Sequence, residues 1–581
     1  MRFARALPPA CFLAAAMVRA EPPGIPAPDL RFGVMTHFAQ GWDPSWIIPM
    51  TDAAIPTVRD ELYWARVEPG PGRFVFPPAY DHYMAELRRH GIDPLVVLSF
   101  ANPGYDGGMT PYTEQGFSAY ARYGTELLKH YGNQIDAVEI WNEYNGSFCK
   151  GPAEKARAAT YLAMLRTAYL AIKRERPDVT VVGGATSGIP GPYWRKLITG
   201  GGLAHMDAVS VHPYRYRAPP EGMEDEIVRL RALMQKYDPG NPRPIWATEI
   251  GWETHSSQAP GDLAIDDVTQ AKFLVRGYAL LLSAGVARIY WYLLHDEHGL
   301  TMGLTRDNAA RTPRPAFAAM ATMIRELREA RFVRREASLP GLYSLVFERP
   351  SGVEVRVMWS LQPIAVQASG AESGEDYLGQ KLAVLSPLNL TDAPVFVQGP
   401  LRDLPPAPPP VVDNILTDSA RDFSDRQGKN GWTYGSITGD SSSFVPMTDY
   451  EVTDWKEAWV DPGSNLSISS EDQHPAATRA HRQVAAVRRW TSPAGGRIRV
   501  SGHFRCQTLG DGVGVGILVD GNRQFRKLLG GGHPVLDAFD FVKQVHPGSV
   551  IDIAVDPGPA TDINYDATAV EVIIRKEPAD E

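Results

Sequence analysis

The chain has 581 residues, of which 44% are hydrophobic and 22% charged, and it carries a formal net charge of −9. This length allows about two to four domains, and the composition is that of an ordinary soluble protein. The acidic balance argues against a nucleic-acid partner, and no apolar run reaches the roughly 18 residues that span a bilayer.

The first twenty residues look like a secretory signal. Two arginines precede an apolar run over residues 10–18, and Val18-Arg-Ala20 offers small residues at a cleavage position. This order is typical of exported proteins. A Pro-Pro pair interrupts the apolar run, so an irregular N-terminus is the alternative. We therefore expect a signal peptide at 1–20 and a secreted or periplasmic protein.

Residues 21–330 alternate between apolar runs that predict strands and periodic stretches that predict helices. The run over residues 94–100 is almost wholly apolar, as expected of a parallel strand that is buried on both faces. Eight strands alternating with helices over about 300 residues are the pattern of a (β/α)8 TIM barrel. An open doubly wound sheet is the alternative. It rarely supplies eight such units, and no glycine-rich phosphate loop follows the first strand.

Beyond the predicted barrel the apolar pattern changes to a period of two, which is typical of half-buried strands. This pattern predicts a small accessory β-sandwich at 331–402. The proline-rich stretch at 403–412 predicts a stiff linker. Further alternating runs predict a C-terminal β-sandwich of the jelly-roll type at 413–581. We expect a fold class of α/β barrel followed by two β-domains.

The C-terminal domain is a candidate carbohydrate-binding module, because aromatic rings can stack on the flat faces of sugars. Packing in the domain core is the alternative for these aromatic residues. They are Trp432, Tyr434, Trp455, Trp459 and Trp490. The acidic residues Asp556, Asp562 and Asp566 offer oxygen ligands for calcium. Their spacing fits a cluster of turns better.

Two acidic residues directly follow predicted barrel strands. Glu143 ends the run that starts at Ala137, and Glu249 ends the run that starts at Ile245. Barrel enzymes place their active sites at the carboxyl ends of the strands, so we expect the two carboxylates to face each other. Such a pair is the minimum equipment for glycoside hydrolysis. The structural alternative is that one or both cap helices or pair with arginines.

Glycoside hydrolysis needs a neutral carboxyl that protonates the leaving oxygen and an ionised carboxylate that attacks the anomeric carbon. Glu143 follows Asn142, whose amide could hydrogen-bond a sugar hydroxyl, so we assign Glu143 as the acid/base. Arg59 and Tyr214 could keep Glu249 charged by lowering its pKa. We therefore assign Glu249 as the nucleophile.

Other polar and aromatic residues lie at or just beyond predicted strand ends. Trp291 could form the pocket floor by stacking on the sugar ring, with barrel core as the alternative. His37, His212 and Trp252 are candidate substrate-binding residues, although His212 could be only a buried, hydrogen-bonded histidine. No HExxH motif or paired CxxC motif is present, so we expect no metal and no cofactor. The absence of a GxSxG elbow argues against a serine hydrolase.

The residues at these strand ends resemble those of the clan A glycoside hydrolases. The matching motifs, in strand order, are Arg59, Trp141-Asn-Glu143, His212-Pro-Tyr214, Thr248-Glu249 and Trp291. The stretch Val58-Arg-Asp-Glu-Leu-Tyr-Trp64, with Val67-Glu-Pro-Gly70 and Gly72-Arg-Phe-Val-Phe76, is most similar to glycoside hydrolase family 39. That family includes β-xylosidases, α-L-iduronidases and bacterial endoglycosidases that cut biofilm exopolysaccharide. The resemblance covers about residues 30–330 and, through the barrel-plus-sandwich layout, about 30–400.

The resemblance implies net retention through a covalent glycosyl-enzyme, with Glu143 as acid/base and Glu249 as nucleophile. It also implies substrate contacts for the neighbouring site residues, which are Asn142, Arg59, His212, Tyr214 and Trp291. The C-terminal domain departs from simple family 39 enzymes and suggests a polymeric substrate held at a second site. We expect an exopolysaccharide or a hemicellulose as substrate. The alternatives are an exo-acting β-xylosidase or β-galactosidase on oligosaccharides, and a non-enzymatic carbohydrate-binding matrix protein.

Overall fold

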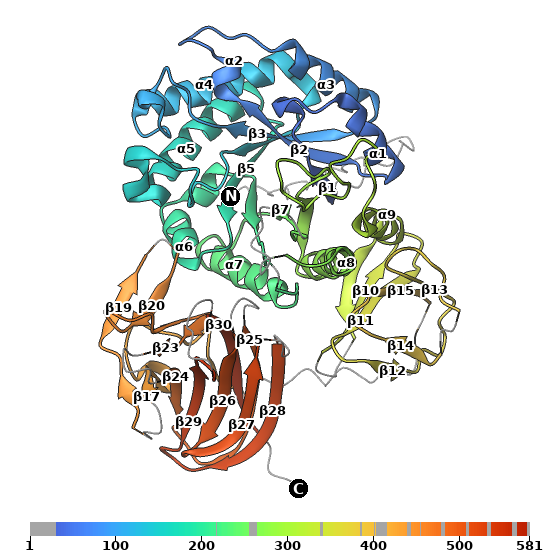
Figure 1. The fold of residues 1–581 in the computed structure, drawn as a ribbon. Coiled ribbons are helices and arrows are strands. Elements are labelled where there is room, and N and C mark those ends of the chain that lie inside the picture. The colour runs from blue at the N-terminus through green and yellow to red at the C-terminus, as the bar shows by residue number, and fades with distance from the viewer. Residues whose placement is uncertain are drawn as a thin grey trace, which may run out of the picture.

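The chain folds into a barrel followed by two groups of antiparallel sheets (Figure 1). The computed structural model describes residues 31–577 except 217, 255–263, 337–340, 384–385, 400, 402–414, 439–442, 454, 478–482, 507–510, 532–535 and 560–565. The predicted signal peptide, the predicted linker at 403–412 and Asp562 lie outside the described residues. Among the helices that are described, none is long and apolar enough to cross a membrane.

Eight parallel strands form a closed barrel, because β8 pairs back onto β1. The strands are β1 (Phe32–Met35), β2 (Thr57–Tyr63), β3 (Asp93–Ser99), β4 (Ala137–Ile140), β5 (Thr180–Ser187), β6 (Ala208–His212), β7 (Ile245–Ile250) and β8 (Val286–Trp291). The outer helices are α3 (Pro78–Arg89), α4 (Glu114–Tyr131), α5 (Arg157–Glu175), α6 (Gly191–Thr199), α7 (Met223–Tyr237), α8 (Asp267–Ser283) and α9 (Pro315–Leu327). Two short helices, α1 (Ile47–Asp52) and α2 (Trp64–Val67), lie in the first loops. The predicted TIM barrel is confirmed.

The interior of the barrel is filled by side chains rather than left open. One buried layer takes its members from six different strands, namely Leu95, Ala137, Val182, Ala208, Trp246 and Tyr290. Gly33 makes room for this layer, because a Cβ at that position would lie 2.3 Å from the ring of Tyr290. Packing of this kind gives the strand ends a rigid base.

The accessory region packs one five-stranded sheet against a two-stranded sheet. The larger sheet has the order β13 (Ser373–Asp376), β15 (Val395–Gln398), β11 (Glu354–Ser360), β10 (Leu342–Glu348) and β9 (Arg331–Arg335). The smaller pairs β12 (Ile364–Val366) with β14 (Leu388–Leu390). The accessory region has its own buried cluster, to which the larger sheet contributes Leu342, Met358 and Val397.

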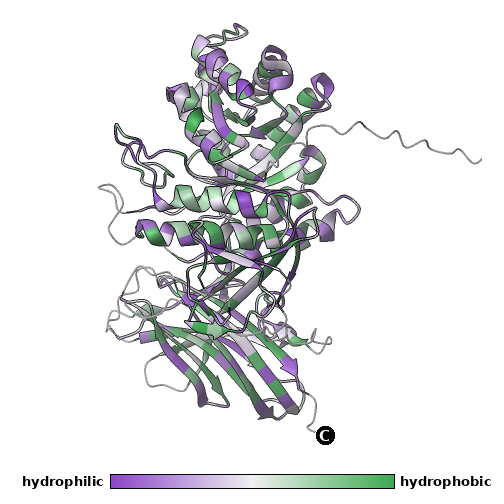
Figure 2. Cartoon of the chain, turned by 90° about the vertical axis from the view of Figure 1, so that its right-hand side faces the viewer, coloured by the Kyte–Doolittle hydropathy of each residue, from purple (hydrophilic) through white to green (hydrophobic). Residues whose placement is uncertain are grey.

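The C-terminal region is a sandwich of two antiparallel sheets, as predicted. One sheet runs β19 (Asp449–Val452), β20 (Glu457–Val460), β21 (Ser467–Ser469), β22 (Asp472–His474), β30 (Thr568–Lys576), β25 (Gly496–Cys506) and β28 (Leu536–Val545), and β16 (Ile415–Asp418) also pairs with β30. The other runs β18 (Val445–Pro446), β17 (Trp432–Thr438), β24 (Gln483–Thr491), β29 (Val550–Asp556), β26 (Val513–Val519) and β27 (Asn522–Leu529), with β23 (Ala476–Ala477) on β24. Hydrophilic and hydrophobic residues alternate along these strands (Figure 2).

The aromatic residues of this sandwich are mostly core. Trp432, Tyr434, Trp459 and Trp490 are buried between the sheets. Of the five aromatic residues that were candidates for stacking on sugars, only Trp455 is exposed, at 48%. The core alternative is therefore right for four of them.

A buried ion pair in the barrel also accepts a hydrogen bond from the accessory sheet. Arg276 of α8 donates from Nε to Glu221 Oε1 at 2.7 Å, and the side chains are 2% and 1% exposed. Trp359 of β11 donates to the same oxygen at 2.9 Å. Three chain segments therefore depend on one carboxylate that is cut off from water, and removal of its cation would leave the negative charge uncompensated.

We expect Arg276→Leu to destabilise the protein by about 3–5 kcal/mol, because it leaves Glu221 buried without its cation. The matched control is Arg325→Leu. The side chain of Arg325 is 53% exposed, and the substitution removes its ion pair with Glu375. That change should cost about 1 kcal/mol or less. Urea unfolding followed by tryptophan fluorescence measures both. Equal losses in the two variants would contradict this account of the interface.

Candidate active site

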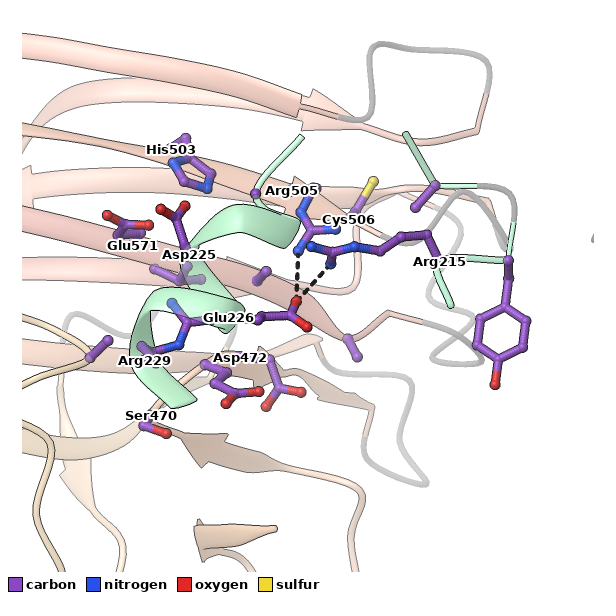
Figure 3. A pocket seen from close by; sticks show the side chains of 18 of the residues that line it. Arg215, Asp225, Glu226, Arg229, Ser470, Asp472, His503, Arg505, Cys506 and Glu571 are labelled. Atoms are coloured by element: carbon purple, nitrogen blue, oxygen red, sulfur yellow. Dashed lines mark ion pairs between the residues drawn. The ribbon is translucent and has the colours of Figure 1, made fainter. Parts of the chain in front are cut away.

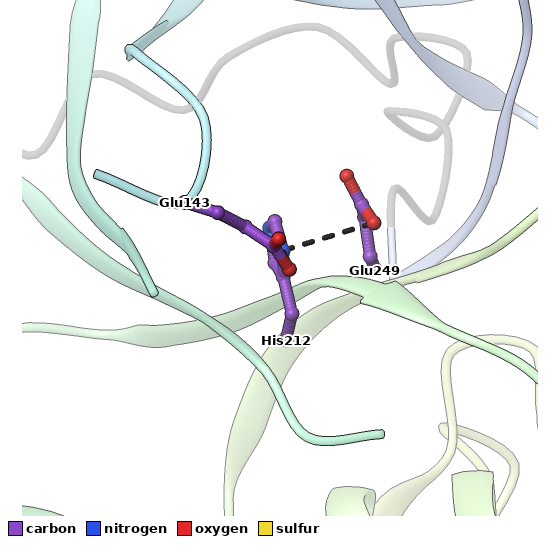
Figure 4. A group of neighbouring side chains, drawn as sticks. All are labelled: Glu143, His212 and Glu249. Atoms are coloured by element: carbon purple, nitrogen blue, oxygen red, sulfur yellow. Dashed lines mark hydrogen bonds and ion pairs between the residues drawn. The ribbon is translucent and has the colours of Figure 1, made fainter. Parts of the chain in front are cut away.

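The predicted acidic residues meet at the carboxyl end of the barrel. Figure 4 shows Glu143, from the loop after β4, and Glu249, near the end of β7, on either side of His212 at the end of β6. One side-chain atom from each of the three lies within 4.8 Å of the other two. The side chain of Glu143 is 17% exposed and that of Glu249 is 9% exposed. The expectation that the two carboxylates face each other is confirmed.

Arg59 of β2 connects three strand ends through one guanidinium. Its Nη1 donates to Glu249 Oε1 at 2.6 Å, its Nε to Glu139 Oε2 at 2.6 Å, and its Nη2 to Asn142 Oδ1 at 2.8 Å. Arg59 is fully buried. Burial opposes its charged form, but the carboxylates of Glu139 and Glu249 together raise the pKa of Arg59 above its usual value. The guanidinium is therefore a permanent positive charge beside Glu249.

Tyr214 holds the second oxygen of Glu249. Its hydroxyl donates to Glu249 Oε2 at 2.8 Å, while Arg59 holds Oε1. Both oxygens therefore accept hydrogen bonds, which fixes the orientation of the carboxylate. This is the arrangement expected of a nucleophile that must stay charged.

A buried chain of hydrogen bonds, which the sequence pattern does not indicate, supports the site. Thr248 Oγ1 donates to Glu139 Oε1 at 2.8 Å and lies 3.1 Å from His212 Nε2. Because the hydroxyl proton of Thr248 goes to a carboxylate, which only accepts, His212 Nε2 must carry the proton that reaches Thr248. The other ring nitrogen, Nδ1, then faces Glu143 Oε1 at 3.0 Å.

His212 and Glu143 share their electrostatic environment. Burial would raise the pKa of the Glu143 carboxyl, but the hydrogen bond and charge of His212, with the charge of Arg59, bring this pKa below its usual value. Burial would also lower the pKa of His212, but Glu249 and Glu143 raise it. The imidazole thus tends to hold the proton of the pair in the free protein.

The backbone around Glu143 is strained. Trp141 and Glu143 have φ values of 68° and 43°, in the left-handed region that side-chain-bearing residues avoid. Such residues cost about 1–3 kcal/mol each and persist where the surroundings enforce them. Here the N–H of Glu143 donates to the carbonyl of Ala185 at 2.7 Å. The strand ends at Ile140, three residues earlier than predicted, and this tight turn directs Glu143 into the site.

The predicted substrate contacts of Trp291 and Trp252 are wrong. Both are fully buried and stack on each other with ring centroids 5.9 Å apart. Their ring N–H groups donate to the carbonyls of Met302 and Ala218. Tyr292, the next residue after Trp291, lies nearer the site, with its ring 6.4 Å from that of Tyr214. Successive strand residues point to opposite faces, so an error of one residue selects the wrong aromatic ring.

Arg59 and His212 are fully buried and contact the acidic side chains. For Arg59 this position beside Glu249 is the one predicted from the sequence, and the substrate contacts of both residues stay predictions. Asn142 is 5% exposed and is oriented by Arg59.

His37 lies at the edge of the site. It is paired with Glu297, which also accepts from Trp42 Nε1 at 2.7 Å. The ring of His37 lies 6.0 Å from that of Tyr292. Phe148 follows Glu143 in the same loop, and its exposed ring stacks on Phe100 with ring centroids 5.2 Å apart.

Glu143, His212 and Glu249 are close enough together to offer ligands to a metal ion. The hydrogen-bond geometry fits a metal poorly, because Arg59 and Tyr214 already occupy both oxygens of Glu249. A guanidinium at 2.6 Å would also repel a cation. The absence of a metal stays a prediction.

No protein-family model matches this sequence, and no curated protein sequence is significantly similar to it. Solved structures do resemble the fold. A family 39 glycoside hydrolase from the gut symbiont Bacteroides cellulosilyticus WH2 is 23% identical with a TM-score of 0.56, over 64% of this chain and 81% of that one. This likeness shows the fold.

Two further solved structures match over a larger fraction of both chains, but with lower sequence identity and lower TM-scores. A family 39 β-xylosidase from Caulobacter crescentus is 15% identical with a TM-score of 0.47, over 66% of this chain and 98% of that one. A family 39 enzyme from Xanthomonas axonopodis pv. citri is 12% identical with a TM-score of 0.43, over 91% and 94%. The fold expected from the resemblance to family 39 is confirmed by the Bacteroides structure.

Proposed function

We propose that this protein is a retaining glycoside hydrolase that cleaves O-glycosidic bonds by double displacement. The observation that carries the proposal is the separation of Glu143 and Glu249, whose nearest functional atoms lie within 4.8 Å. Retaining enzymes hold their two carboxyl groups about 5–5.5 Å apart, whereas inverting enzymes need about 6.5–9.5 Å to admit a water.

In the first step Glu249 attacks the anomeric carbon, and the bond to the leaving oxygen breaks as Glu143 donates a proton to it. Arg59 and Tyr214 hold the attacking carboxylate in position through hydrogen bonds to its two oxygens. The product is a glycosyl ester of Glu249. Conversion of Glu249 to an ester removes its negative charge from the side of His212.

In the second step Glu143, now a carboxylate, takes a proton from water, which attacks the anomeric carbon and releases Glu249. His212 supports both states of Glu143. When Glu143 is protonated, Nδ1 of a neutral His212 can accept its hydrogen bond. When Glu143 is ionised, a protonated His212 can donate to it across the same 3.0 Å contact.

Within this class we propose a polymeric substrate, an exopolysaccharide or a hemicellulose. The exposed ring of Phe148, five residues after Glu143 in the same loop, offers a stacking surface for a further sugar. The C-terminal sandwich would supply a second contact with a long chain. We also propose export, on the N-terminal pattern alone. Hydrolysis confined to short oligosaccharides would favour the exo-acting alternative, and tight polysaccharide binding without product would favour the matrix-protein alternative.

We expect Glu249→Ala to abolish hydrolysis of aryl glycosides, because it removes the nucleophile. Glu143→Ala should slow substrates with poor leaving groups by about 10²–10⁴-fold, the usual contribution of general acid catalysis. The matched control is Glu126→Ala on α4, which breaks only a surface ion pair with Lys129. Release of the aryl group, measured by absorbance, follows all three. Wild-type rates in Glu249→Ala would overturn the proposal.

The first sugar released should have the same anomeric configuration as the substrate. This follows from the short separation of the carboxyl groups, which leaves no room for a water behind the sugar. Proton NMR of the products, recorded before the anomers interconvert, measures it. Release of the opposite anomer would mean that Glu249 acts on a water instead.

The pH dependence should respond to His212. Glu143 must be protonated to act as the acid. Because its pKa is lowered, activity should be lost at a lower pH than it would be with an unperturbed glutamate. Removal of the imidazole in His212→Asn raises the pKa of Glu143 and should move the basic limb of kcat/KM to higher pH. His130→Asn, which removes a surface histidine paired with Asp81, is the control. A basic limb that stays in place or moves to lower pH in His212→Asn would refute the coupling.

A further inference from the structure

A polar cavity of about 210 Å³ lies between the barrel and the C-terminal sandwich. Its walls come from the loop after β6, the first turns of α7 and the β25 and β30 strands, as Figure 3 shows. Tyr214 lines this cavity, and its hydroxyl also holds Glu249. Tyr214 is therefore a neighbour of both the interdomain cavity and the proposed nucleophile.

Two arginines in this cavity carry buried N–H groups that lack acceptors. Arg215, whose side chain is 8% exposed, uses Nη1 to pair with Glu226 at 2.9 Å. Its Nε and Nη2 are buried and have no hydrogen-bond partner among the described residues. Arg505 of β25 has Nη2 4.0 Å from Glu226, and its buried Nε likewise lacks a partner there. Unmet buried donors are costly, and those on guanidinium groups are more so.

The unmet donors of the two arginines border the same small space. A Cβ built on Gly222 would lie 3.8 Å from Nε and Nη2 of Arg505 and 3.9 Å from Nη2 of Arg215, with nothing nearer. The Nε and Nη2 edge of Arg215 presents two parallel donors, which match the two oxygens of a carboxylate or a sulfate. The space thus suits an anionic group that accepts from both arginines.

Charged groups from every wall face this space. They are Arg215 of the loop, Asp225, Glu226 and Arg229 of α7, Glu471 and Asp472 at β22, His503 and Arg505 of β25, and Glu571 of β30. Burial raises the pKa of Glu471 and of Glu571 to about 7. Burial lowers the pKa of Arg505 to about 10, so this arginine stays charged at neutral pH. The cavity consequently becomes less negative as pH falls below about 7, because Glu471 and Glu571 take up protons.

We propose that this cavity is a saccharide subsite that binds a sugar bearing a carboxylate or sulfate group, through Arg215 and Arg505. The inference rests on the proposed function and names a class of substrate for it, an acidic polysaccharide. Tyr216, which is 62% exposed, lines the same cavity and offers a ring for stacking on a sugar. The C-terminal domain then completes the substrate-binding surface instead of acting as a separate module.

Binding of three sugars to the full chain tests the proposal, namely glucuronate, glucose 6-sulfate and glucose. NMR titration at pH 6 and pH 8 measures each affinity. At least one charged sugar should bind about tenfold or more tightly than glucose, as expected for charge-assisted hydrogen bonds. Its affinity should be higher at pH 6. Preference between the two charged sugars distinguishes a uronic acid from a sulfated sugar.

Arg505→Gln and Arg215→Lys should each lose that preference. The lysine variant keeps the charge and the pairing with Glu226 but lacks the two parallel donors, so it carries the test if Arg505→Gln does not fold. Arg499→Gln, on the same strand but in surface ion pairs with Asp540 and Glu577, is the control and should bind like the wild type. Equal affinity for the three sugars, or wild-type binding in Arg215→Lys, would overturn the subsite.

Failure of the subsite and failure of the proposed function are distinguishable. Glu249→Gln should lose hydrolysis and keep the preference for the charged sugar, since Glu249 does not line the cavity. Hydrolysis by the wild type without any preference for charged sugars would overturn the subsite alone. Such a preference without hydrolysis of any glycoside would overturn the proposed function alone.

Discussion

The arrangement of the site depends on one buried guanidinium. Arg59 bonds Glu249, Glu139 and Asn142, which come from two other strands or their ends, so the strand ends meet at a fixed distance. A fully buried cation is costly by itself, and these carboxylates compensate its charge. The hydrogen bond from Arg59 also fixes the position of Glu249. Stability of the barrel and readiness of the nucleophile are thus two results of one interaction.

The acid/base side of the site is built differently. Glu143 lies on a strained turn, and its partner His212 is held from behind by Thr248 and Glu139. The chain from Arg59 through Glu139 to His212 therefore joins the two acidic residues without a direct contact between them. A proton that moves between His212 and Glu143 changes the charge near Glu249 very little. Such a site can hold both protonation states that double displacement needs.

The fold and the acidic pair could be predicted from the sequence because their signals are local. Apolar runs and helical periods identify the barrel, and a carboxylate after a buried strand predicts Glu143 and Glu249. The floor aromatic ring could not be chosen, since Trp291 and Tyr292 are adjacent and only the strand geometry decides which faces the site. Glu139, and the link that Thr248 makes between Glu139 and His212, were missed because both residues lie inside strands, where sequence patterns predict packing. The arginine cavity could not be predicted because Arg215 and Arg505, which both approach Glu226, are remote in sequence.

The central claim is that Glu249 forms a covalent bond to the sugar while Glu143 manages the proton. Incubation with a 2-deoxy-2-fluoro glycoside, which slows breakdown of such an ester, followed by peptide mass spectrometry, tests it most directly. The account predicts one sugar adduct, on the peptide that contains Glu249 and absent from Glu249→Gln. An adduct on Glu143, or hydrolysis of the parent glycoside that proceeds unchanged in Glu249→Gln, would contradict it.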